Sequence, residues 1–433
     1  MKNNLLLATI FVVLPCLTGL LATPGSLNAQ VSFSGKTMGP ITYNVVVNET
    51  VEDETATTSG IQGQLDQVNN LMSTYIDSSD VSRFNTAKAG EWVDVDPLTL
   101  QVVARAIELG KLTDGAFDIT VGPAVKRWKF GPDANKIKFP TDAEVEQLSE
   151  FVGIDKVELR TEPPAIRKLH DQTEIDLSAI AKGFAVDHVA NWLQDRGHSN
   201  FMVEVGGEVI VQGAGPKGKW RIGIEKPNLY GQAIAAVLEL ENSAVATSGD
   251  YRNVRMYNGK RISHTIDPKT CRPVDNPPPS CSVLADDCMT ADALATAVMV
   301  MGAKKGLEFC EQHGFELNVY NRNSDNKVDS VATAGFPIRA DQEAERSSEQ
   351  TQSIWPAFVG ALVVFSLAIA GMAVGAIFND RPITGSCGGI ASKPNEDGSS
   401  SCSLCEKPVV DCPDQASEQD ATDHDPNETT AAC

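Results

Sequence analysis

The sequence has few aromatic residues and no local basic patch. Phenylalanine, tryptophan and tyrosine together make up 6% of the 433 residues, which is too few to suggest a broad base-stacking surface. The formal net charge is -21 at pH 7, and so acidic a chain repels phosphate backbones. We therefore expect no nucleic-acid partner. We also expect a cation or backbone N–H groups wherever this chain binds an anionic phosphate.

Cysteine is nearly absent from the first 270 residues, where only Cys16 occurs. Four of the ten cysteines lie between Cys271 and Cys310, and five lie between Cys387 and Cys433. A small disulfide-stapled domain would spread its cysteines through the fold, so that class is excluded. The clustering indicates two modules or two compartments. No repeat of fixed period is present.

The first of two apolar segments lies at the N-terminus. Lys2 precedes Leu5–Leu21, which carries no charge, and a small-residue cleavage point follows at Ala29. Residues 1–29 are therefore predicted to be a signal peptide, with an uncleaved N-terminal anchor as the alternative.

The second apolar segment, Trp355–Phe378, carries no charged residue and is long enough to span a bilayer. We predict a polar linker at 340–353, a transmembrane helix at 354–378 and a Cys-rich acidic tail at 379–433. The tail loses apolar residues toward its end, which favours partial disorder. Export by the first segment would leave residues 30–339 outside and the tail inside, in agreement with Arg381 after the span.

Residues 30–339 form the body of the chain, for which the patterns predict an α+β fold with a large antiparallel component. Period-2 alternation predicts strands, and helical spacing of apolar residues predicts helices. The expected strands are 32–48, 157–159, 201–212 and 220–225. The expected helices are 61–72, 98–111, 179–194 and 291–301.

Two segments of the body are rich in turn and helix-start residues. Thr113–Pro123 begins with an Asp-Gly turn, after which a strand-like apolar piece is expected. Glu174–Gly183 contains Asp176 and Ser178, typical of a helix start, and Lys182 about one turn later. Such a start with a nearby lysine suits a phosphate, although an ordinary capped helix explains the pattern as well.

Three further motifs carry polar groups suited to chemistry. Gly206-Gly207-Glu208 interrupts a strand pattern, which indicates close approach of a ligand or a plain bulge. His264 lies between two hydroxyl residues and is either catalytic or structural. Asp292 and Thr296 are four residues apart and share a helix face, where they form a hard oxygen pair suited to Mg²⁺ or Ca²⁺ or a simple contact within the helix.

The order of these motifs resembles the ApbE family, whose members are FAD:protein FMN transferases. The resemblance also rests on Met38-Gly39, Met72–Tyr75, Ser82–Asn85, Trp128–Gly131 and Thr247–Tyr251, and it covers residues 32–335. It implies an ApbE-like mixed α/β exported domain. It also implies that FMN is joined by a phosphodiester to a threonine or serine hydroxyl of a target protein while AMP leaves.

The resemblance further implies a set of site residues. Catalysis would involve His264, Asp292 and Lys182, with His264 deprotonating the acceptor hydroxyl or holding the phosphates. Mg²⁺ would bind the side chains of Asp292 and Thr296 and the carbonyl of Ala179, offsetting charge at the pyrophosphate. The implied contacts to FAD, the substrate, are Met38, Tyr75, Ala116, Phe117, Asp118, Asp176, Lys182 and Ile266.

One position departs from the family pattern. Cys271 stands where the family usually has glycine, and Cys281 follows ten residues later. An external disulfide between them and two free thiols are both open at this point.

The tail starts with Gly385-Ser386-Cys387-Gly388-Gly389 and continues with Cys402-Ser403-Leu404-Cys405 and Cys412. Together with the preceding apolar helix, this tail is similar to a different family, the one-helix NqrM-type membrane proteins. This resemblance covers about residues 356–412, and it implies iron handling by thiolates in the tail. The thiols are Cys387, Cys402, Cys405 and Cys412. A disordered acidic tail with incidental cysteines is the alternative.

Together the two resemblances imply a place for this chain in the cell. They predict a bacterial inner-membrane protein with a periplasmic catalytic domain and a cytoplasmic tail. Its partners would be flavin-accepting subunits of the sodium-translocating NADH:quinone reductase or a related electron-transfer complex. The competing interpretations are an FAD pyrophosphatase and a non-enzymatic flavin-binding assembly scaffold.

Overall fold

The computed structural model describes residues 30–130, 138–227, 233–250, 254–322, 328–339, 391–394 and 400–402. It divides the chain into two units, residues 1–344 and 345–433. The segments predicted at 1–29, 340–353 and 354–378 lie outside the described residues, as do Cys387, Cys405 and Cys412. Among the described residues, no helix combines the length and the hydropathy that a membrane span requires.

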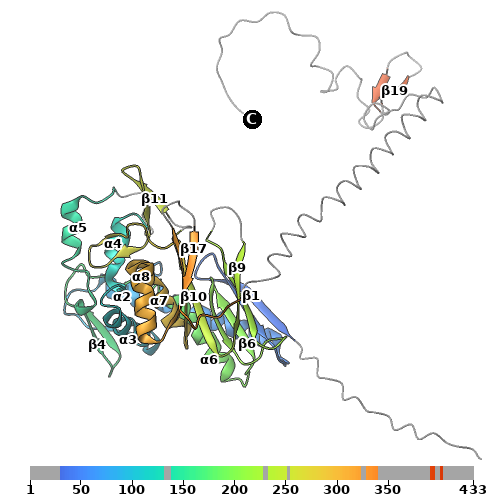
Figure 1. Cartoon of the computed structure of the whole chain (residues 1–433), viewed down its shortest axis with the longest axis horizontal. Helices are drawn as coiled ribbons and strands as arrows, with labels where there is room; N and C mark the ends of the chain where they lie inside the picture. The colour runs from blue at the N-terminus through green and yellow to red at the C-terminus, as the bar shows by residue number, and fades with distance from the viewer. Residues whose placement is uncertain are drawn as a thin grey trace, which may run out of the picture. The chain divides into compact units, whose positions relative to one another are not determined.

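The first unit is built around an eight-stranded sheet in which every neighbouring pair is antiparallel (Figure 1). This confirms the predicted large antiparallel component. In spatial order, the strands are β1 (Val31–Thr37), β2 (Ile41–Val47), β6 (Phe201–Val205), β7 (Glu208–Gln212), β10 (Ser243–Gly249), β15 (Ser280–Ala285), β16 (Glu316–Arg322) and β17 (Val328–Ala332).

Both faces of this sheet are buried. Along β2, Val45 and Val47 pack into one hydrophobic core, whereas Val46 packs into a second core on the opposite face. This division follows from the pleat, which points successive side chains to opposite faces. Because the three valines are consecutive, apolar side chains point to both faces of the sheet, and neither face is left to solvent at β2.

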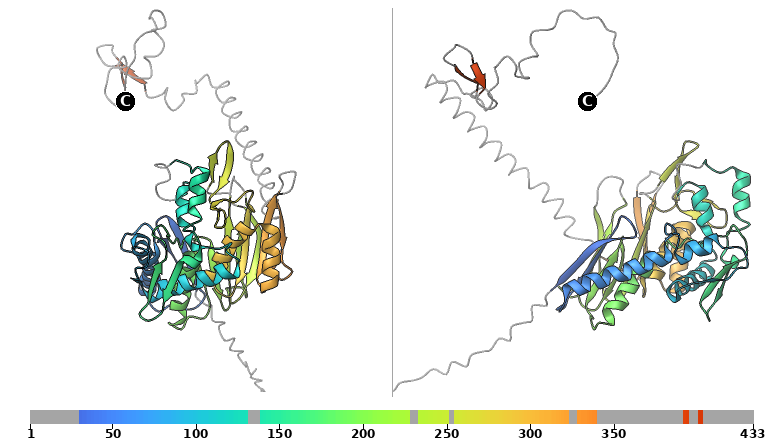
Figure 2. Two further views of the ribbon diagram at one scale, coloured as in Figure 1. Left: turned by 90° about the vertical axis from the view of Figure 1, so that its left-hand side faces the viewer. Right: turned by 180° about the vertical axis from the view of Figure 1, so that it is seen from behind.

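Helices cover one face of the sheet. In the view from behind in Figure 2, α1 is blue and can be followed along its length. The covering helices are α1 (Glu54–Met72), α6 (Ala181–Gln194), α7 (Cys288–Met301) and α8 (Ala303–His313), and α3 (Pro97–Leu112) packs on α1 and α7. The helix α7 packs on β10, β15 and α6, and its residues are buried nearly all round. The predicted helices at 61–72, 98–111, 179–194 and 291–301 are all present, with starts displaced by one to seven residues.

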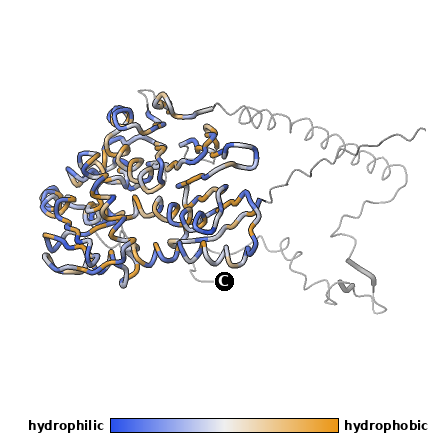
Figure 3. The backbone as a smooth tube through the Cα atoms, turned by 90° about the horizontal axis from the view of Figure 1, so that it is seen from below, coloured by the Kyte–Doolittle hydropathy of each residue, from blue (hydrophilic) through white to orange (hydrophobic). Residues whose placement is uncertain are grey.

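A smaller antiparallel sheet covers the second core. It consists of β8 (Trp220–Glu225), β9 (Ile234–Leu240) and β18 (Ile338–Arg339). Trp220, Ile222 and Leu238 point into that core. Figure 3 shows hydrophobic and hydrophilic residues interspersed along helices and strands, as expected of elements buried on one side.

A lobe beside the helical layer contains part of the main core, with Phe84, Val93 and Ile166, and a third core around Trp128 and Phe151. The lobe is formed by the remaining described elements of the first unit. They are α2 (Asp80–Thr86), η1 (Ile119–Val121), α4 (Gly122–Arg127), α5 (Asp142–Leu148), η2 (Ile154–Lys156), β3 (Val93–Asp94), β4 (Val157–Arg160), β5 (Ala165–Lys168), β11 (Val254–Tyr257), β12 (Lys260–Ser263), β13 (Ile266–Asp267) and β14 (Arg272–Pro273).

Two local predictions were wrong in conformation. The expected strand-like piece after Asp114-Gly115 is the short helix η1, because Asp118 Oδ1 accepts a 2.7 Å hydrogen bond from Thr120 N and starts a turn there. The strand expected at 201–212 is two strands, β6 and β7, and Gly206-Gly207 between them is not the plain bulge, whereas the expected approach of a ligand agrees with Gly206 lining a cavity. Both glycines have positive φ, and they form the two-residue turn of the β6–β7 hairpin.

The second unit contains one described element pair, β19 (Ala391–Pro394) and β20 (Ser400–Cys402), which run antiparallel. The backbone of Cys402 ends β20. Metal binding by the tail thiols therefore stays a prediction.

Candidate active site

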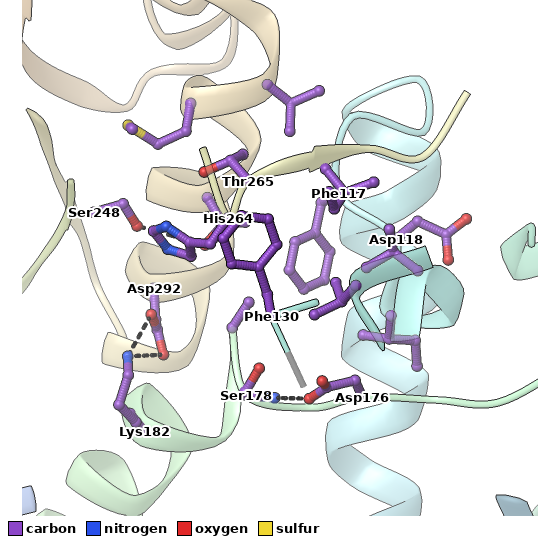
Figure 4. A pocket seen from close by; sticks show the side chains of 18 of the residues that line it. Phe117, Asp118, Phe130, Asp176, Ser178, Lys182, Ser248, His264, Thr265 and Asp292 are labelled. Carbon is purple, nitrogen blue, oxygen red and sulfur yellow. Dashed lines mark hydrogen bonds and ion pairs between the residues drawn. The ribbon is translucent and has the colours of Figure 1, made fainter. Parts of the chain in front are cut away.

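A cavity of about 470 Å³ lies between the helical layer and the lobe (Figure 4). Its lining comes from the turn before η1, the start of α6, the face of α7 and the segment after β12. With one exception, all the site residues predicted in the body line it. They are Tyr75, Ala116, Phe117, Asp118, Asp176, Ala179, Lys182, His264, Ile266, Asp292 and Thr296. The exception is Met38, which lies in the β1–β2 turn and packs against the main core.

A cation between two carboxylates lies on one wall of the cavity. Lys182 Nζ is 3.1 Å and 3.3 Å from the two carboxylate oxygens of Asp292, and 2.8 Å from Glu208 Oε1. Asp292 is 2% exposed and Glu208 is 3% exposed. The other oxygen of Glu208, Oε2, is buried and has no hydrogen-bond partner among the described residues.

Burial and charge act in opposite directions on this cluster. Burial alone lowers the pKa of Lys182, but the carboxylates of Asp292 and Glu208 outweigh it, so that pKa is raised and the ammonium stays charged. Burial raises the pKa of Glu208 to about 7, an effect that Lys182 opposes and Asp292 adds to. Two carboxylates and one ammonium leave the ionised cluster with one net negative charge.

The oxygen donors expected of a magnesium site are brought together here. Asp292 and Thr296 lie one turn apart on α7, and Thr296 Oγ1 is 3.5 Å from Ser248 Oγ on β10. Ala179 lies just before α6 and lines the same cavity. A carboxylate, a hydroxyl and a carbonyl form an oxygen set of the kind that Mg²⁺ prefers. No group of three or more His, Cys, Asp or Glu residues suited to a metal occurs in the described part of the chain, but the predicted set needs only one of these.

The loop at 173–180 carries Asp176 and Ala179 to the cavity. Asp176 and Ser178 do not cap the helix expected at 179–194, because α6 begins at Ala181 and Asp176 Oδ1 accepts a 2.9 Å bond from Ser178 N within the loop. The backbone of Ile175 is bonded on both sides by the amide of Asn85, which accepts from Ile175 N at 2.8 Å and donates to Ile175 O at 3.0 Å.

Further hydrogen bonds, made by Lys168 and Ile119, hold this loop in place. Lys168, which is 1% exposed, donates through Nζ to the carbonyls of Asn85 at 2.8 Å and Thr173 at 3.0 Å. Asp176 N donates to Ile119 O at 2.7 Å. The backbone of the loop is therefore held by bonds to Asn85, Lys168 and Ile119.

Asp118 has a structural role that the sequence did not reveal. Its carboxylate accepts from Thr120 N and Thr120 Oγ1, and from Ile154 N at 3.0 Å. Burial raises the pKa of this carboxyl, and the hydrogen bonds oppose that effect. The two oxygens are thus committed to holding the turn before η1 and the start of η2.

Aromatic groups also line the cavity. Figure 4 shows the rings of Phe130 and His264 next to each other, with Phe117 close to Phe130. The ring centroids of Phe130 and His264 are 6.3 Å apart, and the rings meet edge to face. Tyr75 lines the cavity but is 75% exposed. A flat aromatic ligand could therefore contact both buried and exposed aromatic side chains here.

Two acidic residues, Asp187 and Glu208, were missed as functional candidates. Asp187 on α6 accepts 2.8 Å bonds from the N–H groups of Cys288 and Met289, which start α7. In return, Asp292 Oδ2 on α7 accepts a 3.0 Å bond from Gly183 N near the start of α6. Each helix therefore caps the other. Glu208 was singled out only as part of a glycine motif, and nothing in a single sequence shows that it faces Lys182.

The described cysteines of the body are Cys271, Cys281, Cys288 and Cys310, and all four are buried free thiols. The disulfide alternative for Cys271 and Cys281 is therefore not realised. Burial raises the pKa of the Cys271 thiol to about 11 and that of Cys310 to about 12, so neither is poised as a nucleophile.

Comparison with known proteins places this geometry in a family. The model of the ApbE family matches residues 38–320. An FAD:protein FMN transferase of Vibrio cholerae is 44% identical over 71% of this chain and 92% of the relative. One of Haemophilus influenzae is 41% identical over 70% of this chain and 90% of the relative. The solved structure of the flavin transferase ApbE from Vibrio cholerae superposes with a TM-score of 0.65 at 39% identity, covering 72% of this chain and 99% of that one.

Proposed function

This chain belongs to the ApbE family and is an FAD:protein FMN transferase, and on that premise we propose a magnesium-dependent reaction at the cavity. FMN is joined through a phosphodiester to a threonine or serine hydroxyl of the target protein, and AMP is released. The observation that carries the proposal is the convergence of Asp292, Thr296 and Ala179 on the cavity that Lys182 and His264 also line.

The reaction balances as a displacement at the phosphorus on the FMN side of the pyrophosphate. The acceptor oxygen forms a bond to that phosphorus, and the bond from phosphorus to the bridging oxygen breaks, so that AMP leaves with the bridging oxygen. The hydroxyl proton passes to His264, whose ring lies in the cavity beside Phe130.

The residues of this chain divide the remaining work. Asp292, Thr296 and the carbonyl of Ala179 would hold Mg²⁺, which when bound offsets negative charge on the pyrophosphate oxygens. Lys182 adds a positive charge beside them. The aromatic rings of Phe117 and Phe130 exclude water and orient the flat flavin ring.

Transfer and simple hydrolysis are separated by incubating the protein with FAD, Mg²⁺ and a threonine-containing target peptide. Transfer gives flavin fluorescence on the peptide after denaturing electrophoresis, and a matched peptide with alanine for the threonine stays dark. Release of free FMN with no labelled peptide would support the pyrophosphatase alternative instead.

A non-enzymatic flavin-binding scaffold is tested with Asp292→Ala. Because Asp292 is the only carboxylate among the proposed metal ligands, its loss should collapse turnover by about a hundredfold or more. A scaffold would keep assembling its partner at the wild-type level.

The cellular part of the proposal rests on the sequence. We propose that the enzyme is exported and anchored in a bacterial inner membrane, with the body periplasmic and the tail cytoplasmic, as the apolar segments 5–21 and 355–378 suggest. Alkaline phosphatase fused after residue 339 should be active, whereas the same reporter fused after residue 390 should be inactive.

The partners proposed are flavin-accepting subunits of the sodium-translocating NADH:quinone reductase, with the tail thiols aiding iron-site assembly. The support is the resemblance of residues 356–412 to the NqrM type and the four tail cysteines, Cys387, Cys402, Cys405 and Cys412. Deletion of the gene should lower both the covalent flavin and the iron content of the pump. If both contents stayed unchanged, this part would be wrong.

A further inference from the structure

Glu208 is an acidic residue of the cavity that the proposed function does not use. It begins β7, directly after the Gly206-Gly207 turn, and its carboxylate is almost completely buried. Oε1 is 2.8 Å from Lys182 Nζ, while Oε2 has no partner among the described residues. A buried carboxylate oxygen without a donor costs folding free energy. Because this one lies in the wall of a cavity, we look for a ligand that would interact with it.

The geometry around Lys182 indicates which ligand this is. In the described structure the Lys182 ammonium is bonded to both Asp292 and Glu208. Without Glu208, the Lys182–Asp292 pair would be neutral. With an ionised Glu208 the wall is negative, which attracts a divalent cation and repels a pyrophosphate.

We infer that Glu208 is a positioning residue that makes the cavity accept Mg²⁺ before FAD, by holding Lys182 and keeping the wall negative until the cation arrives. The inference rests on the proposed magnesium dependence and adds an order of binding to it. Once a divalent cation has bound, the three side chains and the cation together carry one positive charge, which suits the anionic pyrophosphate.

Two opposite changes in affinity distinguish this role from a structural one. Glu208→Gln keeps the shape and one acceptor oxygen for Lys182 but removes the charge. Mg²⁺ should then bind about tenfold more weakly, as is usual when a group just outside the ligands is changed. FAD without Mg²⁺ should bind about threefold more tightly or better, because a repelling charge is gone. Damage to the fold would instead weaken the binding of both Mg²⁺ and FAD.

The experiment measures Mg²⁺ binding by titration calorimetry and Mg²⁺-free FAD binding by flavin fluorescence, with the full chain at pH 8. Glu204→Gln is the matched control, because Glu204 belongs to the same hairpin and accepts from Gly207 N at 2.8 Å but does not line the cavity. Glu208→Asp, which keeps the charge, should recover most of the Mg²⁺ affinity. Melting temperatures of all variants establish that they are folded.

The outcomes separate this inference from the proposed function. Weaker Mg²⁺ binding with tighter Mg²⁺-free FAD binding in Glu208→Gln, and neither change in Glu204→Gln, supports the inference. Wild-type Mg²⁺ affinity in Glu208→Gln, or a parallel loss of both affinities, overturns it and leaves the magnesium dependence standing. A wild-type protein that binds no Mg²⁺ overturns both.

Discussion

Removal of the Asn85 amide tests whether its hydrogen bonds to the backbone of Ile175 hold the loop at 173–180 in place. In Asn85→Ala, Ile175 loses the acceptor of its N–H and the donor to its carbonyl, bonds of 2.8 Å and 3.0 Å. Ile175 is buried, so water cannot easily replace them. The loss should cost about 1–2 kcal/mol for each backbone group, or about 2–4 kcal/mol of unfolding free energy in total.

That cost should appear both in stability and in binding. The melting temperature should fall by about 3–6 °C. The KM for FAD should rise about tenfold, because the loop carries Asp176 and Ala179 to the cavity. The kcat at saturating FAD should fall by a smaller factor than KM rises, since His264, Asp292 and Thr296 come from other elements and only Ala179 of the proposed Mg²⁺ ligands lies on the loop.

The assay combines differential scanning calorimetry with steady-state transfer to a target peptide over a range of FAD concentrations. Asn191→Ala is the matched control, because Asn191 is an exposed residue on the surface of α6. A melting temperature within about 1 °C of wild type, or a fall in kcat with an unchanged KM, would refute the reasoning.

Three further predictions concern the helices, the thiols and the metal. Asp187→Asn should lower the unfolding free energy by about 1–3 kcal/mol in urea, because the amide cannot accept from both Cys288 N and Met289 N; an unchanged midpoint would contradict the capping role. Brief maleimide treatment of the native protein at pH 8, followed by peptide mapping, should leave Cys271 unlabelled, since burial raises the pKa of this thiol to about 11; rapid labelling would show that it is accessible. Chelation with EDTA should stop transfer and added Mg²⁺ should restore it, and turnover that persists in EDTA would contradict the metal dependence.

Local patterns predicted the regular elements well. The alternation in Trp220–Glu225 coincides with β8, and the helix expected at 98–111 matches α3 to within one residue at each end. In α3, Asp96 accepts from Leu98 N and Pro97 occupies the first turn, both of which are readable start signals. Where the chain supplies its own caps and period, sequence and structure agree.

Tertiary interactions decided the cases in which the patterns failed. Asp118 and Asp176 look alike as turn or cap residues. The carboxylate of Asp118 accepts from two separate backbone segments, at Thr120 and Ile154, whereas that of Asp176 accepts from Ser178 N within its own loop. The site residues were predicted from the resemblance to the ApbE family, because their motifs follow one another in the family's order even though they lie far apart in the sequence. The link from Lys182 to Glu208 joins α6 to β7, and such a pairing depends on the packing of elements rather than on any local pattern.

The central claim is that the cavity transfers FMN from FAD to a protein hydroxyl with Asp292 at its metal site. The most direct test is the intact mass of the acceptor protein, measured together with AMP, after incubation with FAD and Mg²⁺. The account predicts that the acceptor gains one FMN less one water for each AMP released, and that Asp292→Asn gives neither product. An acceptor of unchanged mass beside equal amounts of free FMN and AMP, or full labelling by Asp292→Asn, would contradict it.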